Sequence, residues 1–150
     1  MTAANPPAAA EAVPRAEHFP HAADAGVRGI GLTRDQAFEQ AALALTALVT
    51  DPAAVRPERA VEISCEARDD AMLLVEWLNA VIYRMAVDRM LFARFTIRSD
   101  GQRLSATAWG EPVDRVRHAP AVEPKGATLT ALKVTRGADG AWMAQCVIDV

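Results

Sequence analysis

The sequence has little cysteine. Among its 150 residues only Cys65 and Cys146 are cysteines, and neither belongs to a CxxC pair or to a close cysteine–histidine cluster. A zinc site of the usual spacing is therefore excluded. Both residues lie in apolar, strand-like runs, so we interpret them as reduced thiols packed in the core of a cytoplasmic protein.

Long apolar runs are also missing. The longest candidate, AALALTALV at residues 41–49, is far shorter than the roughly 18 residues needed to cross a bilayer. The first fourteen residues are rich in alanine and proline and lack the basic start and leucine-rich stretch of a secretory signal. We expect residues 1–15 to form a disordered tail, residues 16–150 to form one domain, and the protein to stay in the cytoplasm without binding a membrane.

The chain has no basic stripe and no catalytic signature. Its net charge is −3, and its arginines are interspersed with acidic residues. This pattern argues against direct binding of nucleic acid, because phosphate contacts supply most of that affinity. The GxSxG, HExxH, P-loop and GxGxxG motifs are all absent, so we expect no catalytic residues.

Two helices are predicted from apolar residues at helical spacing. Thr33 and Gln36 form a capping-box signature ahead of a helix over residues 34–49. Asp69 or Asp70 caps a second helix. The apolar stripe of this second helix consists of Leu74, Trp77, Leu78, Val81, Ile82 and Met85. Its width predicts the main core helix of the domain.

Strands and hairpins dominate the rest of the chain. Two short strands are expected near the start of the chain, at residues 17–19 and 26–32. The later strands are residues 60–67, two arms that turn at Asp100-Gly101, and two arms of a final hairpin, Lys125–Thr135 and Ala141–Val150. In the arm that begins at Met90, the residues expected on one face are Leu91, Ala93, Phe95 and Ile97. Residues 111–120 are expected to form a polar surface loop. The order of elements predicts an α+β fold, with two helices packed on a largely antiparallel β-sheet.

Two carboxylates stand in unusual surroundings. Asp24 precedes a short apolar run, and Asp149 is the penultimate residue of an apolar strand, one residue before the carboxylate of Val150. Anions so close together repel unless water or a cation compensates them. Two interpretations stay open at this point. The strand end frays into water, or the three groups form an oxygen-ligand site for a cation such as Ca²⁺ or Mg²⁺.

Several motifs resemble the archease family. They are HAADAGVRGIG at 21–31, DDAMLLVEWLNAVIY at 69–83, WGE at 109–111 and the closing W-x5-IDV. Each is weak alone, but their order and spacing agree from about His18 to Val150. The resemblance implies an archease-like α+β fold and a protein that is not itself an enzyme. It implies an activator that helps a GTP-dependent, RtcB-type RNA ligase to load guanylate and turn over repeatedly in tRNA splicing or RNA repair.

The resemblance also implies a divalent-metal site at Asp24, Asp149 and Val150. Ca²⁺ is the expected ion, with Mg²⁺ and Mn²⁺ as alternatives, and RNA is expected to be contacted only through the ligase. Further residues that match motif positions are expected to support the site or face the partner: His21, Asp69, Glu111, His118 and Lys125. Simpler roles stay open for them: a hydrogen-bonded histidine, a helix N-cap at Asp69, or members of a surface loop.

The chain departs from the family pattern at one strand. Leu129 and Thr130 stand where the family has a tyrosine and a histidine, so whatever those side chains contribute in the family is missing here. An alternative function is a general chaperone-like protein-binding module without a dedicated ligase. A stand-alone metal-dependent phosphoesterase is disfavoured, because no general base or phosphate-gripping arginine cluster is evident.

Overall fold

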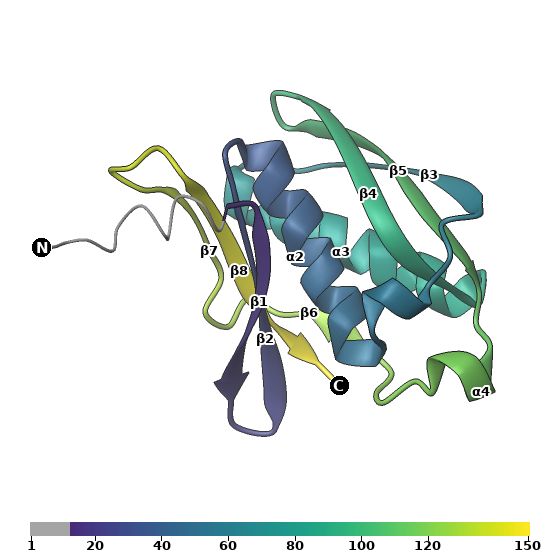
Figure 1. Ribbon diagram of the computed structural model, residues 1–150. Coiled ribbons are helices and arrows are strands. Elements are labelled where there is room, and N and C mark those ends of the chain that lie inside the picture. Colours follow the sequence, from purple (N-terminus) through teal and green to yellow (C-terminus); the bar gives the residue numbers. More distant parts are fainter. Residues whose placement is uncertain (1–12) are drawn as a thin grey trace, which may run out of the picture.

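Two antiparallel sheets enclose a pair of helices in the computed structural model, which describes residues 13–150 (Figure 1). The first sheet contains β1 (Arg15–His21), β2 (Asp24–Gly31), β8 (Trp142–Asp149), β6 (Gly126–Ala127) and β7 (Lys133–Arg136). Its strand order is β1-β2-β8-β6, and β7 also pairs with β8. The disordered tail predicted for residues 1–15 lies mostly outside the described residues, and Arg15 already belongs to β1.

The second sheet has the order β3-β5-β4. Its strands are β3 (Arg59–Glu66), β4 (Met90–Asp100) and β5 (Arg103–Pro112), and the helical elements are α2 (Arg34–Val49), η1 (Pro52–Ala54), α3 (Asp70–Val87) and α4 (Arg115–His118). The predicted α+β class with helices on antiparallel sheet is confirmed, and the strands divide between two sheets. None of the helices within residues 13–150 is both long and apolar enough to cross a membrane.

Both predicted helices begin where their caps indicated. Thr33 Oγ1 accepts a hydrogen bond from Gln36 N at 3.0 Å, while Gln36 Oε1 accepts one from Leu32 N at 2.7 Å. Asp69 Oδ1 accepts from Met72 N at 2.8 Å at the start of α3. These bonds satisfy backbone N–H groups that the first helical turn leaves without partners.

Strand β2 and helix α2 come into close backbone contact at Gly29. A Cβ added at Gly29 of β2 would lie 2.0 Å from the carbonyl oxygen of Ala37 and 2.4 Å from the nitrogen of Ala41, both in the backbone of α2. Only a residue without a side chain permits this contact. The position of α2 on the first sheet therefore depends on Gly29.

The main core lies between the sheets and is centred on α3. All six residues of the predicted α3 stripe are buried. Trp77 is fully buried, its Nε1 donates to the carbonyl oxygen of Phe38 at 3.0 Å, and its ring meets Phe95 edge-on with centroids 5.8 Å apart. Cys146 is buried in the core as predicted, whereas Cys65 is only half-buried against it. Burial raises the pKa of the thiols, to about 11 at Cys65 and about 12 at Cys146, as expected for unreactive cysteines.

The predicted alternation in β4 is wrong in its first half. A β-bulge shifts the register between Phe92 and Arg94, so one extra residue changes which side chains face the core. Phe92, rather than Ala93, is fully buried beside Phe95 in the main core. Leu91 instead packs in a small second cluster with Val49 and Val55.

The predicted final hairpin is only partly correct. Its return arm is β8, but residues 125–135 form no continuous strand. The pairing is confined to β6 and β7. Between them the chain leaves the ladder, where Thr128 Oγ1 donates to the carbonyl oxygen of Val147 at 2.8 Å and Thr130 O accepts from Val147 N at 3.1 Å. Two short pieces therefore replace one strand.

Candidate functional site

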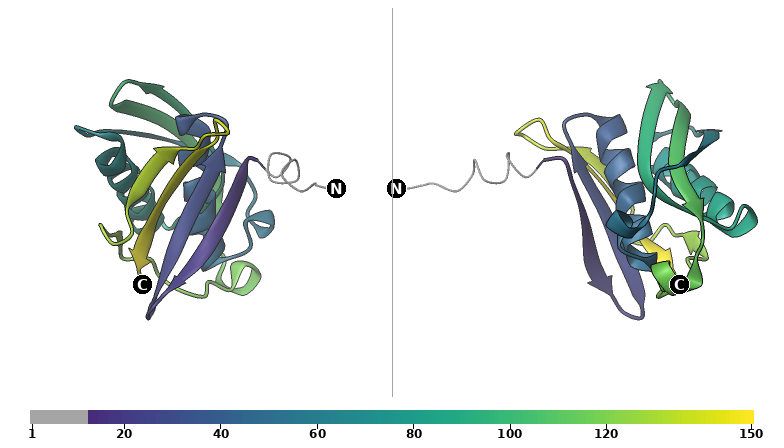
Figure 2. Two further views of the ribbon diagram at one scale, coloured as in Figure 1. Left: turned by 90° about the vertical axis from the view of Figure 1, so that its left-hand side faces the viewer. Right: turned by 45° about the vertical axis from the view of Figure 1, so that its right-hand side comes forward.

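Predicted site residues from three strands meet at one end of the first sheet. The register pairs His21 with Asp24 across β1 and β2, and Gly126 with Asp149 across β6 and β8. The ladder between β2 and β8 ends at the pair of residues 25 and 148, and Asp24 and Asp149 are the residues that follow this last pair. Paired Cα atoms within such a ladder are about 5 Å apart, so each aspartate is next to a residue of a closely spaced pair. The turn between β1 and β2 and the C-terminus lie at the same end of the first sheet (Figure 1, Figure 2).

Strand alternation puts the two carboxylates on the same face of the sheet. Gln145 lies four positions before Asp149 on β8, with Val147 midway between them. Arg28 lies four positions after Asp24 on β2. Arg28 Nε donates to Gln145 Oε1 at 2.9 Å, so these side chains share a face. Because side chains repeat every second residue along a strand, Asp24 and Asp149 lie on that face too. Asp24 is half-buried and Asp149 is exposed.

Lys125 and Val150 lie at the same end of the sheet. Lys125 N donates to the carbonyl oxygen of Asp149 at 2.8 Å, and Val150 packs against the edge of the main core. Within residues 13–150, no three His, Cys, Asp or Glu side chains gather closely enough to hold a metal ion. The predicted metal set has a different composition, because it combines two aspartates with the carboxylate of Val150.

This donor set suits a hard cation. Carboxylate oxygens are the ligands that Ca²⁺ and Mg²⁺ prefer, and thiolates and clustered imidazoles, which select softer metals, do not belong to the set. Asp24 and Asp149 bring like charges to adjacent strand ends, each next to the last pair of the β2–β8 ladder. A bound cation would offset that repulsion.

Glu111 and His118 form a separate, buried cluster with Arg117. Both Glu111 and His118 are less than 5% exposed. The Arg117 guanidinium donates to both Glu111 oxygens, at 2.6 and 2.8 Å, and the Arg56 backbone nitrogen donates to Oε2 at 2.8 Å. The surface loop expected over residues 111–120 is therefore wrong, because Glu111 belongs to β5 and residues 115–118 form α4.

The hydrogen bonds of His118 define its tautomer. Nδ1 accepts from Asp114 N at 2.8 Å, so the ring proton lies on Nε2, which donates to Glu111 Oε2 at 2.9 Å. Thr50 Oγ1 donates to the carbonyl oxygen of His118 at 2.6 Å. The cluster thus fastens α4 to β5 and to the end of α2, which is a structural role.

Glu111 predicts a pH-dependent stability. The Arg117 guanidinium, with the Arg56 N–H and His118, lowers the pKa of this carboxyl from 4.5 to about 2, against the opposing effect of burial. A lowered folded-state pKa contributes stability above the unfolded-state value that is lost as pH falls toward the folded-state value. We expect the unfolding free energy to fall between about pH 4.5 and pH 2 more steeply in the native protein than in Glu111→Gln.

Urea unfolding at a series of pH values measures this difference. Glu66→Gln is the matched control, since Glu66 is exposed and its ion-pair contact with Arg103 is long, at 3.7 Å. The control is expected to keep the native pH profile. Equal slopes in the native protein and Glu111→Gln would contradict the role assigned to the cluster.

Asp69 lies apart from the other predicted residues. It is the N-cap of α3, and the next residue, Asp70, pairs with Arg34 at 2.6 Å. Asp24 begins β2, whereas Arg34 begins α2 just after β2 has ended. Arg34 and Asp70 therefore lie near the other end of β2. The cap explains Asp69 fully, so the structure brings it to neither the aspartate pair nor the Glu111 cluster.

Sequence reasoning missed Arg117 as the partner of Glu111. A four-residue helix gives no periodic signal, and Arg117 reads as one of several dispersed arginines. The one local signal for this helix was Asp114, three residues before Arg117, because aspartate is a favourable N-cap residue. Its Oδ1 accepts from the backbone nitrogens of both Val116 and Arg117.

Comparisons with known proteins agree on one family. The model of the archease protein family (MTH1598/TM1083) matches residues 17–150. Protein archease of Thermococcus gammatolerans is 36% identical over 140 residues, covering 91% of this chain and 99% of that protein. Protein archease of Methanopyrus kandleri is 38% identical over 138 residues, covering 89% and 98%.

Solved structures share the fold. The solution structure of Methanobacterium thermoautotrophicum protein 1598 matches with a TM-score of 0.77 and 26% identity, over 90% of this chain and 98% of that one. A Thermotoga maritima crystal structure, described as an archease and possible chaperone, matches with a TM-score of 0.60, 15% identity, and 89% and 96% coverage. With matching motifs, fold and near-complete coverage, this chain belongs to the archease family.

Proposed function

We propose that this protein is a non-enzymatic, metal-binding activator of an RtcB-type RNA ligase. Membership of the archease family supports an archease role. The observation that supports the finer proposal is the β2–β8 register, whose last pair is Ala25 and Ile148. Asp24 and Asp149 are the residues next to this pair, although 125 positions separate them in sequence. The protein's contribution is to promote guanylylation of the ligase, and RNA is contacted through the ligase.

Asp24, Asp149 and the carboxylate of Val150 would hold the divalent ion. The ion would supply positive charge that neutralises these anions. His21 lies beside Asp24 on β1 and would orient that carboxylate, and Lys125 lies beside Asp149 and faces the partner. All five residues lie at one solvent-accessible end of the first sheet, where a partner surface has access.

Asp24→Asn and Asp149→Asn are each expected to remove the activation. Amide oxygens are weaker cation ligands than carboxylates, and each change also removes one negative charge from the pair. The assay combines the ligase, GTP, a divalent ion and an RNA with 2′,3′-cyclic phosphate and 5′-hydroxyl ends. Catalytic amounts of native protein are expected to raise guanylylation and turnover at least tenfold, and either variant is expected to return them to the basal rate.

Asp139→Asn is the matched control for this assay. Asp139 is an exposed aspartate in the turn between β7 and β8, where its Oδ1 accepts from Ala141 N, and asparagine can keep that bond. This variant is expected to activate normally. Unchanged ligase turnover with the native protein would refute the activator role even with a metal bound.

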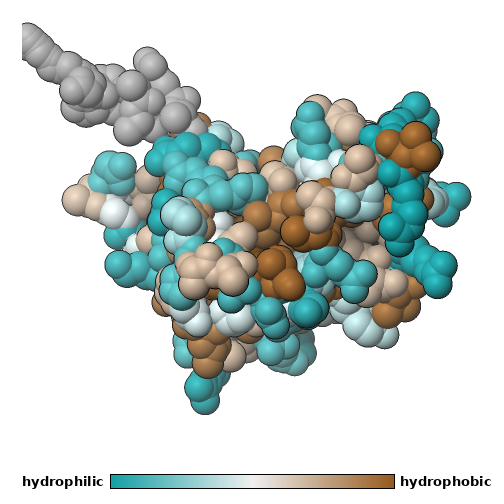
Figure 3. Space-filling model, turned by 90° about the horizontal axis from the view of Figure 1, so that it is seen from below, coloured by the Kyte–Doolittle hydropathy of each residue, from teal (hydrophilic) through white to brown (hydrophobic). Residues whose placement is uncertain are grey.

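A chaperone-like module is the second candidate, favoured by exposed apolar side chains. Seen from the end that carries the C-terminus, apolar patches are scattered among hydrophilic ones (Figure 3). The large exposed apolar residues are Leu32, Tyr83, Val87, Val116 and Leu129. Suppressed aggregation of unrelated proteins at stoichiometric ratios, equal in the native protein and Asp24→Asn, would favour this function over ligase activation.

A further inference from the structure

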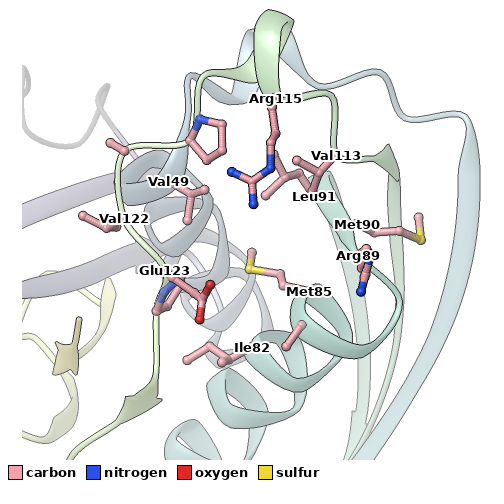
Figure 4. A pocket seen from close by; sticks show the side chains of 14 residues that line it. Val49, Ile82, Met85, Arg89, Met90, Leu91, Val113, Arg115, Val122 and Glu123 are labelled. Carbon is pink, nitrogen blue, oxygen red and sulfur yellow. The ribbon is translucent and has the colours of Figure 1, made fainter.

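A groove opens between the ends of α2 and α3 and the segment that follows α4 (Figure 4). Its volume is about 840 Å³. The floor is aliphatic and consists of Val49, Ile82, Met85 and Leu91, each no more than 9% exposed. The aliphatic floor is the part of the groove that can receive apolar groups from another molecule.

The rim of the groove carries unbalanced positive charge. Arg89 and Arg115 line it together with a single acid, Glu123, and Figure 4 shows the Arg115 guanidinium directed into the hollow. The neighbouring arginines Arg84 and Arg117 are paired with carboxylates. Among residues 13–150, no carboxylate lies within ion-pair distance of Arg89 or Arg115. On a chain of net charge −3, this groove is complementary to an anion.

The fold holds the Arg115 backbone in place. Two residues after it, Arg117 is fixed on both oxygens of Glu111. On the far side of α4, Ala121 N donates to the carbonyl oxygen of Val49 at 2.8 Å. The short helix is thus tied at both flanks, so the backbone that presents Arg115 to the groove has little freedom to lose on binding.

The lining indicates which anion fits. It contains no aromatic ring to stack on a base, no glycine and no hydroxyl or amide side chain, whereas nucleotide sites use such groups. We propose that this groove docks a protein segment in which aliphatic side chains alternate with acidic ones. The aliphatic groups fill the floor and the carboxylates pair with Arg89 and Arg115. Residues 1–12 contain no leucine, isoleucine, valine or phenylalanine, so they cannot supply such a segment, and we assign it to a partner protein.

Methionine methyl groups report on this docking directly. Met85 and Met90 line the groove, whereas Met72 and Met143 do not. The full chain, labelled with ¹³C at methionine methyls, is titrated by NMR with a capped pentapeptide, Leu-Asp-Leu-Asp-Leu. Control titrations use the peptide with lysine in place of both aspartates, and GTP. We expect the acidic peptide to shift the signals of Met85 and Met90 and to leave those of Met72 and Met143 unchanged.

Charge reversal provides the decisive variant. Arg89→Glu with Arg115→Glu is expected to weaken binding of the acidic peptide about tenfold or more and to make the lysine peptide the better ligand. Arg68→Glu with Arg103→Glu changes the charge equally near the opposite end of α3 and is expected to bind like the native protein.

Three results would overturn the proposal. They are no selective shift of Met85 and Met90, equal binding of the lysine peptide by the native protein, or tighter binding of GTP at these methyls. Because the assay contains no ligase and no metal, its outcome is independent of the function proposed above.

Discussion

Replacing Gly29 with alanine is expected to lower the unfolding free energy by about 3 kcal/mol or more, at the upper end of overpacking effects. The added Cβ would meet the Ala37 carbonyl oxygen at 2.0 Å and the Ala41 nitrogen at 2.4 Å. These are backbone atoms of α2, so no side-chain rotation relieves the clash. The helix must move away from the sheet, which opens the packing around Phe38 and Val27.

Gly126→Ala is the matched control for this change. The nearest atom to a Cβ at Gly126 is Asn79 Oδ1 at 3.5 Å, which is an ordinary contact. Its expected effect is within about 1 kcal/mol. Chemical denaturation with circular dichroism measures both variants. A loss at Gly29→Ala no larger than at Gly126→Ala would contradict the close contact between β2 and α2.

Trp77→Ala is expected to cost about 3–5 kcal/mol of unfolding free energy. The substitution removes a fully buried ring from the centre of the main core, together with the hydrogen bond to Phe38 O and the edge-on contact with Phe95. The carbonyl of Phe38 also loses its side-chain donor. Trp77→Phe keeps part of the volume and is expected to lose less.

Tyr83→Ala is the control that separates the loss of a buried side chain from the effect of an alanine substitution in α3. Tyr83 lies on the same helix but is 62% exposed, so its removal is expected to change the unfolding free energy by about 0.5 kcal/mol or less. Denaturant unfolding of both variants gives the comparison. Similar losses at Trp77 and Tyr83 would mean that α3 does not organise the core as described.

Local patterns in the sequence predicted the helices well. The α3 stripe, including Trp77 and Leu78, repeats at helical spacing, and the caps at Thr33 and Asp69 use side chains three residues from their partners. Both signals are contained in short windows of sequence. The hairpin at Asp100-Gly101 was predictable for the same reason.

The features that sequence reasoning missed depend on distant partners. The bulge near Ala93 changes phase without a glycine or proline to signal it. The burial of Glu111 depends on the Arg56 backbone, 55 positions away, and on a four-residue helix that brings Arg117 and His118 back. Neither the bulge nor the burial of Glu111 produces a periodic pattern in the sequence.

The pairing of Asp24 with Asp149 was predicted on different grounds. No local pattern links Asp24 with Asp149. Charge repulsion left a shared cation site as one of two open interpretations, and the resemblance to a family favoured it. The β2–β8 ladder brings their positions together. The identity of the ion remains a chemical inference from oxygen donors.

Calorimetric titration with Ca²⁺ tests most directly whether the two aspartates form one cation site. The native protein is expected to bind one ion per chain, and Asp24→Asn and Asp149→Asn are each expected to abolish that binding, while Asp139→Asn keeps it. Ca²⁺ binding that survives either substitution at native affinity, or the lack of Ca²⁺, Mg²⁺ and Mn²⁺ binding to the native protein, would contradict the account.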